Sequence, residues 1–150
     1  MPAEIIPLRR EKVLLDTSLY ISNFNRNRHA EAITDLIRSR VLYLHSVVFE
    51  ELLAGARSRD LRQLERFKKP FLGAGRVVTP RDEDWEETGM VVNRLIARRE
   101  MNSKGAVGLT HDILIALSAR RQGIRVITEN RRDFELIRSL KDFKLTVWPV

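Results

Sequence analysis

Four acidic residues stand at points of the chain where acidic side chains can meet in space. Asp16 follows a short apolar run, and Glu51 lies at the start of the helix predicted after the second strand. Asp133 lies in the segment after a predicted strand ending at Thr128, and Asp112 begins an apolar helix. In an open parallel sheet, ligands bind beyond the carboxyl ends of the strands, so these acids are the candidates for chemistry.

Carboxylates gathered at one place need a cation between them. Two carboxylates about 4 Å apart repel each other by roughly 4 kcal/mol at an effective dielectric constant near 20. The group would take up protons unless a metal ion neutralised it. The chain contains no cysteine, and an all-oxygen set of ligands suits Mg²⁺ or Mn²⁺ rather than Zn²⁺. The acids therefore predict a site for Mg²⁺ or Mn²⁺.

Each acid also has a purely structural interpretation. Asp16 could begin a turn, and Asp133 could cap a helix that starts at Phe134. Glu51 could be a solvated helix residue, because glutamate is a good helix former. Asp112 is the hardest to explain in this way, since the apolar residues after it leave little polar surface near its carboxylate. The scattered histidines are interpreted as structural or surface residues: His29, His45 and His111.

Alternating strand and helix signals indicate how the acids are positioned. Apolar runs predict strands over residues 13–15, 41–48, 76–79, 124–128 and 144–148. The spacing of apolar and helix-forming residues predicts helices over residues 30–40, 50–69, 82–99, 113–119 and 133–140. This alternation predicts one α/β domain over residues 1–150, with a mainly parallel, twisted sheet flanked by helices and residues 144–148 at its edge.

Three further expectations concern how the helices end and pack. Pro70 should end the helix over 50–69, because proline cannot continue the helical hydrogen bonds. Gly105 and Gly108 should mark a loop. One face of the helix over 82–99 should carry four apolar side chains, namely Trp85, Val92, Leu95 and Ile96.

Composition narrows the class of protein. Lys and Arg number 27 against 20 Asp and Glu, and the net charge of +7 attracts polyanions such as nucleic acid, or an acidic protein. No apolar run is long enough to cross a membrane. The beginning of the chain lacks the layout of a secretory signal, and the absence of cysteine does not indicate an oxidising compartment. We therefore expect a cytoplasmic protein.

Four motifs together resemble those of PIN-domain nucleases, in the same order and with similar spacing. They are LLDTS at 14–18, ELLAG at 51–55, DILIA at 112–116 and TENRRDF at 128–134. The resemblance is closest to the VapC-type toxins of toxin–antitoxin pairs and covers residues 13–148. Residues 1–12 would be an N-terminal extension to this PIN-like domain.

The resemblance implies a Mg²⁺- or Mn²⁺-dependent ribonuclease, usually a homodimer, inhibited by a small VapB-like antitoxin that inserts a segment into the acidic groove. The family's four acids, which serve catalysis and bind the metal, match Asp16, Glu51, Asp112 and Asp133. Its supporting polar positions match Thr128 and Asn130, and Thr17 or Ser18 would help to orient Asp16. Glu50 adjoins Glu51 and could share or replace its role.

An RNA substrate would need cations near the acids, because the acids repel it. The candidates for binding phosphates are Lys104, Arg120, Arg121, Arg125, Arg131 and Arg132. They could equally form a solvated helix face. Two other classes of function stay open: a non-catalytic RNA- or DNA-binding module, and another metal-dependent enzyme such as a phosphatase or DNA nuclease. The chain has no nucleotide-binding glycine loop.

Overall fold

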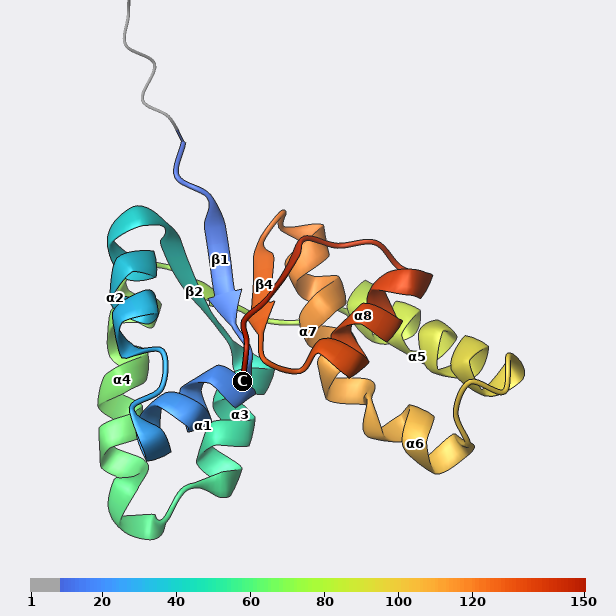
Figure 1. Ribbon diagram of the computed structural model, residues 1–150, viewed down its shortest axis with the longest axis horizontal. Coiled ribbons are helices and arrows are strands. Elements are labelled where there is room, and N and C mark those ends of the chain that lie inside the picture. The colour runs from blue at the N-terminus through green and yellow to red at the C-terminus, as the bar shows by residue number, and fades with distance from the viewer. Residues whose placement is uncertain (1–8) are drawn as a thin grey trace, which may run out of the picture.

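The computed structural model describes residues 9–150, and within them the strands form one parallel five-stranded sheet (Figure 1). The order across the sheet is β3-β2-β1-β4-β5. In chain order the strands are β1 (Lys12–Leu15), β2 (Val41–His45), β3 (Val77–Val78), β4 (Arg125–Thr128) and β5 (Leu145–Val147). All neighbouring pairs are parallel, so the carboxyl ends of the strands point to one edge of the sheet. This confirms the predicted fold class and the edge position of the last strand.

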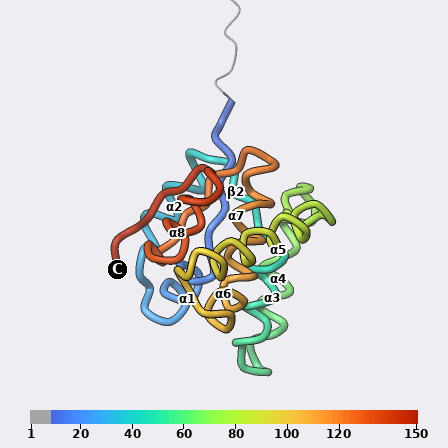
Figure 2. Tube along the Cα trace, turned by 90° about the vertical axis from the view of Figure 1, so that its right-hand side faces the viewer, coloured from blue at the N-terminus to red at the C-terminus, as the bar shows by residue number. Residues whose placement is uncertain are grey.

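Helices flank the sheet. They are α1 (Thr17–Arg26), α2 (Ala30–Ser39), α3 (Ser46–Gly55), α4 (Leu61–Gly73), α5 (Asp82–Ala97), α6 (Ser103–Gly108), α7 (Thr110–Arg121) and α8 (Arg131–Leu140), with a 3₁₀ turn at Ser58–Asp60. In Figure 1, α2 and α4 lie to one side of the strands, and α5, α7 and α8 lie to the other. Figure 2 faces that second side and shows α5 and α6 in front.

Helix α7 forms the centre of the core. Every residue from Ile113 to Ala119 is buried, and the helix contacts α3, α5, α8 and β4. A helix buried on all sides has no need of a polar face, which explains why its sequence is apolar almost throughout. Gly123, whose φ of 67° is the left-handed conformation that glycine adopts readily, lies in the turn between α7 and β4.

Several predicted boundaries were wrong. The predicted strand over 41–48 ends at His45, and the predicted helix over 50–69 is two helices, because the backbone is extended at Ala56 and Arg57. Pro70 lies inside α4, which continues to Gly73. A proline this near the end removes one hydrogen bond of the last turns, and the helix tolerates the loss.

One other expectation also fails. The glycines expected in a loop form α6, whose N-terminus is capped by Asn102 through a hydrogen bond of 2.8 Å from the Gly105 amide. Trp85 was predicted to share an apolar face of this helix with Leu95, and the two differ in burial, since the Trp85 side chain is 53% exposed whereas Leu95 is fully buried. The buried positions of α5 include Val91 and Leu95, which lie one turn apart.

The N-terminal extension falls mostly outside the described residues. Residues 1–8 are not described, and residues 9–11 lead directly into β1, which starts one residue earlier than predicted, at Lys12. In the described part of the chain, no helix is both long and apolar enough to span a bilayer.

His45 gives the fold a dependence on pH. The ring is fully buried at the end of β2, and its Nδ1 accepts a hydrogen bond of 3.1 Å from the Val47 amide. Burial lowers the pKa of His45 to about 4, and the charge of Asp84 opposes this only in part. Because the unfolded chain binds the proton more readily, His45 stabilises the fold fully above its unfolded pKa, roughly 6.5. That stability is lost as the pH falls toward about 4.

We expect the wild type to lose about 2 kcal/mol more stability than His45→Asn between pH 7 and pH 5. Asparagine keeps a hydrogen-bond acceptor for the start of α3 but does not titrate. Urea unfolding of both proteins at the two pH values measures the difference. Parallel pH profiles for the two proteins would show that His45 does not carry this dependence.

Candidate active site

The four predicted acids all lie at the carboxyl edge of the sheet. Asp16 directly follows β1, Glu51 lies in α3 after β2, and Asp133 lies in the first turn of α8 after β4. Asp112 lies in the first turn of α7. The charges of the other three all raise the pKa of Asp112. The structure thus brings residues far apart in the sequence into one another's electric field, at the lower end of the strands in Figure 1.

Asp16 is held by hydroxyl groups from two parts of the chain. Its Oδ2 accepts hydrogen bonds of 2.9 Å from the Thr128 hydroxyl and 3.0 Å from the Ser18 hydroxyl. The side chain is buried, and burial raises its pKa although both hydroxyls oppose that shift. A residue that merely began a turn would not need a partner from a strand 112 residues away. Thr128 and Ser18 therefore fix the direction of this carboxylate.

The geometry separates Glu51 from its neighbour Glu50. Glu51 Oε1 accepts a hydrogen bond of 3.1 Å from the Thr17 hydroxyl, which lies beside Asp16 in the chain. Burial is the main cause that raises the pKa of Glu51, and the charge of Asp16 adds to it. Glu50 is exposed, and its carboxylate lies 3.9 Å from the His111 ring. Glu51 is therefore the residue that faces the other acids.

Burial and three neighbouring charges act on Asp112. Burial raises its pKa to about 8, with further contributions from the negative charges of Asp16, Glu51 and Asp133. At neutral pH this carboxyl therefore holds a proton for most of the time in the metal-free protein. A carboxyl group whose pKa is raised by burial and by neighbouring carboxylates is the electrostatic pattern expected of a cation site that holds no cation.

Asp133 is positioned by the loop between β4 and α8. Asn130 caps α8 by accepting a hydrogen bond of 3.3 Å from the Asp133 amide, and its side-chain NH₂ donates to Asp133 Oδ2 at 3.0 Å. The Asn130 amide in turn donates to the Thr128 hydroxyl at 2.9 Å. Asn130, rather than Asp133, is thus the cap of this helix. The chain of contacts connects Asp133 to Asp16 through Thr128.

The donor set suits a hard divalent cation, since all four candidate ligands are carboxylates. Within residues 9–150, no group of three or more acidic or histidine side chains is already arranged so that it could hold a metal ion. The carboxylates therefore supply the right ligand chemistry and an uncompensated charge, without being closed around a common point.

The predicted phosphate-binding residues divide into two groups. Arg131 and Arg132 lie exposed in the first turn of α8, and Lys104 lies exposed in α6, which contacts α7. The other three lie away from the acids, at the far end of α7 or the beginning of β4, namely Arg120, Arg121 and Arg125. Eight residues of helix, roughly 12 Å, separate Arg120 from Asp112.

Each member of the second group has a partner within the protein. Arg121 forms a salt bridge of 2.9 Å with the buried carboxylate of Asp84, and Arg120 donates to the carbonyl of Asp142 at 2.9 Å. Arg125 pairs with Glu11 at 2.9 Å. These three residues are not brought to the acidic edge, so they do not bind a phosphate there.

One polar cluster beside the site was not anticipated. Glu129 accepts a hydrogen bond of 2.9 Å from the Ser22 hydroxyl, and its other oxygen lies 2.6 Å from Nε2 of His29. The His29 ring lies 5.3 Å from the ring of Trp148. These contacts fasten the segment between α1 and α2 to the loop that carries Thr128 and Asn130. Nothing local in the sequence indicates a pairing across 100 residues.

A groove opens from the acidic edge between α1, α3 and α4. Its volume is about 640 Å³. Its lining includes Glu51 at one end and the exposed apolar side chains of Ile21 and Phe24. An extended segment seated in the groove would therefore contact both apolar surface and one of the four acids.

The fold and this edge define an α/β domain with one buried and three half-buried carboxyl groups at the carboxyl edge of a parallel sheet. The family model of the PIN domain matches residues 13–140, and the chain belongs to this family. A comparison with curated protein sequences finds no match.

Solved structures share the fold. A chain of DNA-bound VapBC from Salmonella typhimurium is 24% identical with a TM-score of 0.62, over 92% of this chain and 98% of that one. A chain of VapBC2 from Rickettsia felis, bound to a fragment of promoter DNA, is 19% identical with a TM-score of 0.65, over 91% of this chain and 98% of that one. A chain of VapBC-1 from nontypeable Haemophilus influenzae is 20% identical with a TM-score of 0.64, over 91% of this chain and 97% of that one.

We expect Asp112→Asn to stabilise the metal-free protein. Because the pKa of Asp112 is higher in the folded chain than in the unfolded chain, its contribution to stability is lost as the pH rises from roughly 4 to about 8. The variant should therefore gain roughly 1–3 kcal/mol over the wild type at pH 8 and less at pH 5. Added Mg²⁺ should stabilise the wild type and narrow the gap.

Thermal unfolding with and without Mg²⁺ measures both effects. Glu50→Gln is the matched control, since Glu50 is exposed and turned toward His111. A variant that is less stable than the wild type at pH 8 would contradict the electrostatic interpretation of Asp112.

Proposed function

We propose that this protein is a metal-dependent endoribonuclease of the VapC toxin type, which hydrolyses phosphodiester bonds in RNA. The observation that carries the proposal is the placement of four acids at the carboxyl edge of a PIN domain, close enough that the charges of three of them raise the pKa of Asp112. Membership of the family and likeness to chains of VapBC support the same proposal.

The four acids would have different roles in binding the metal and in positioning water. Asp16 and Asp112 are the first choices for direct ligands of Mg²⁺ or Mn²⁺, because they are the acids that burial acts on most. Glu51 and Asp133 complete the set through water or position the attacking water. When bound, the metal lowers the pKa of a water molecule and offsets charge that develops on the scissile phosphate.

The protein's own polar residues keep these carboxylates in place. Thr128 and Ser18 orient Asp16, Thr17 orients Glu51, and Asn130 orients Asp133, each by a hydrogen bond. Residues in such supporting roles change metal affinity or activity by roughly 10–100-fold when they are removed. Lys104, Arg131 and Arg132 stay candidates for contacting substrate phosphates beside the acids.

Replacing Asp16 or Asp112 by Asn should reduce RNA cleavage by more than roughly 100-fold, since a ligand matters more than a supporting residue. The substitution keeps the shape of the side chain and removes its charge. Cleavage of labelled transfer, ribosomal and messenger RNA with Mg²⁺, and again with EDTA, provides the measurement. Glu50→Gln, outside the cluster of acids, is the control and should cut normally.

The same assay separates the proposal from its rivals. Full activity of either variant, in preparations freed of contaminating nuclease, would remove the assigned residues from the reaction. Tight RNA binding without cleavage in Mg²⁺ or Mn²⁺ would favour a non-catalytic binding module. Turnover of DNA or of phosphate monoesters in preference to RNA would favour a DNA nuclease or a phosphatase.

A small antitoxin is the proposed partner, seated in the groove between α1, α3 and α4. Apolar side chains exposed beside an acid suit a peptide that buries its own apolar residues and ends on a cation near Glu51. The solved relatives are described as VapBC assemblies, which supports a second component. A homodimer of this chain is also proposed, from the resemblance alone.

Expression of the chain should arrest growth, and coexpression of a small neighbouring gene should relieve the arrest.

Phe24→Glu should weaken the purified complex at least roughly tenfold, because it puts a charge into an apolar contact. Ile37→Glu on α2 is the matched control, since the two side chains are 53% and 54% exposed and Ile37 lies outside the groove. Equal weakening by both variants would show that the partner binds outside the groove.

Light scattering of the complex counts the copies of this chain, and two are expected.

A further inference from the structure

Basic residues stand at the beginning of four strands, at the edge of the sheet opposite the acids. Lys12 and Arg125 are the first residues of β1 and β4. Arg40 directly precedes β2, and Lys144 directly precedes β5. These strands are consecutive in the sheet, in the order β2-β1-β4-β5.

The register of the strands sets these cations nearly level. Lys12 pairs with Val41, so Arg40 lies one residue below that level. Val13 pairs with Arg125, and Val126 pairs with Leu145, so Arg125 and Lys144 lie one residue above it. Neighbouring strands are about 4.8 Å apart, so the row is roughly 14 Å wide.

One carboxylate lies among these cations. Glu11 Oε1 is 2.9 Å from Nε of Arg125 and 4.0 Å from Nε of Arg40. The hydrogen bond from Arg125 is the main cause that lowers the pKa of Glu11, and the charges of Arg40 and Lys144 add to it. Three basic side chains therefore surround a single acid, which leaves an excess of positive charge.

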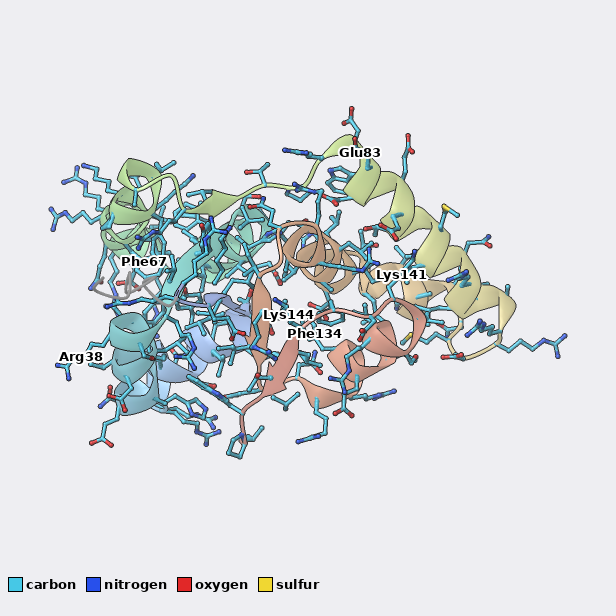
Figure 3. All side chains as sticks on the ribbon, turned by 90° about the horizontal axis from the view of Figure 1, so that it is seen from above. Arg38, Phe67, Glu83, Phe134, Lys141 and Lys144 are labelled. Atoms are coloured by element: carbon cyan, nitrogen blue, oxygen red, sulfur yellow. The ribbon has the colours of Figure 1, made fainter. Side chains whose placement is uncertain are left out.

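The cations that Glu11 does not neutralise face solvent. Arg40 and Lys144 are exposed, and so are Arg9 and Arg10, which lead into β1. Lys12 lies over the ring of Tyr43, with 5.8 Å from Nζ to the ring centroid. Figure 3 looks on to this edge from above, with Lys144 near the centre of the view.

We propose that this edge is a second RNA-binding surface, which holds the sugar-phosphate backbone of the substrate away from the acids. It is called the basic edge here and consists of Arg9, Arg10, Lys12, Arg40 and Lys144, whereas Arg125 is engaged by Glu11. The choice of RNA rests on the proposed function, whereas the binding of a phosphate backbone rests on the charges. Arginine suits it because its guanidinium group donates paired hydrogen bonds to phosphate oxygens.

Two observations favour a nucleic-acid backbone here. The acids at the other edge repel RNA, so attraction has to come from surfaces nearby, and Arg120 and Arg121 are engaged within the protein. Strands of four residues, roughly 13 Å, separate the two edges. A folded RNA is large enough to contact both.

Binding of labelled single-stranded RNA in EDTA tests the basic edge without cleavage. The double variant Arg40→Ala with Lys144→Ala should bind roughly 25-fold more weakly at about 0.1 M salt, with the difference vanishing toward about 1 M. The slope of log affinity against log salt should fall by roughly 1.4, about 0.7 for each phosphate contact. The conservative pair Arg40→Lys with Lys144→Arg should bind as the wild type does.

The control removes the same charge from two exposed residues at the end of α5, as Arg94→Ala within the helix and Arg98→Ala at its C-cap, and should leave RNA affinity unchanged. Equal losses in the two double variants would reduce the effect to net charge and overturn the proposal. So would unchanged affinity in the Arg40 and Lys144 variant, or tighter binding of duplex DNA than of RNA. The binding assay is done in EDTA and does not depend on cleavage. A failure to cut RNA in the separate assay with Mg²⁺ would therefore count against the proposed function alone.

Discussion

The site depends on negative charge that the fold holds out of water. Asp16 is buried, and Asp112 lies at the start of a helix that is buried on every side. All three charges that act on Asp112 are negative. Such a group contributes nothing to stability in its charged form, and an apolar side chain of similar size would serve the core better. The arrangement therefore needs an explanation outside folding, and a cation is the one that chemistry provides.

Sheet topology is what makes this concentration of charge possible. The order of the strands reverses between β1 and β4, which lie side by side although more than 100 residues separate them. Ligands of open α/β sheets bind at such a reversal. Asp16 follows one of these strands and Thr128 ends the other, so their hydrogen bond crosses the reversal point. The remaining acids come from helices that pack around it.

The sequence predicts the features that local pattern controls. Apolar runs followed by polar residues place all five strands and put Asp16, Glu51 and Asp133 at their carboxyl ends. The sequence did not predict which side chains far apart in the chain contact each other. The salt bridge of Arg121 with Asp84 and the contact of His29 with Glu129 depend on which helices pack together. Residue type alone does not distinguish an arginine that faces solvent from one that forms a salt bridge within the protein.

The error over Arg125 follows from the direction of the strands. Arg125 was predicted to bind substrate phosphates beside the carboxylates, because the acids alone would repel RNA. A parallel strand has a fixed polarity, however, so the residue that opens it and the residue that follows it belong to opposite edges of the sheet. Lys12 and Asp16 bracket β1 in the same way. Because every strand runs in one direction, the position of a charged residue relative to its strand decides which edge of the sheet it joins.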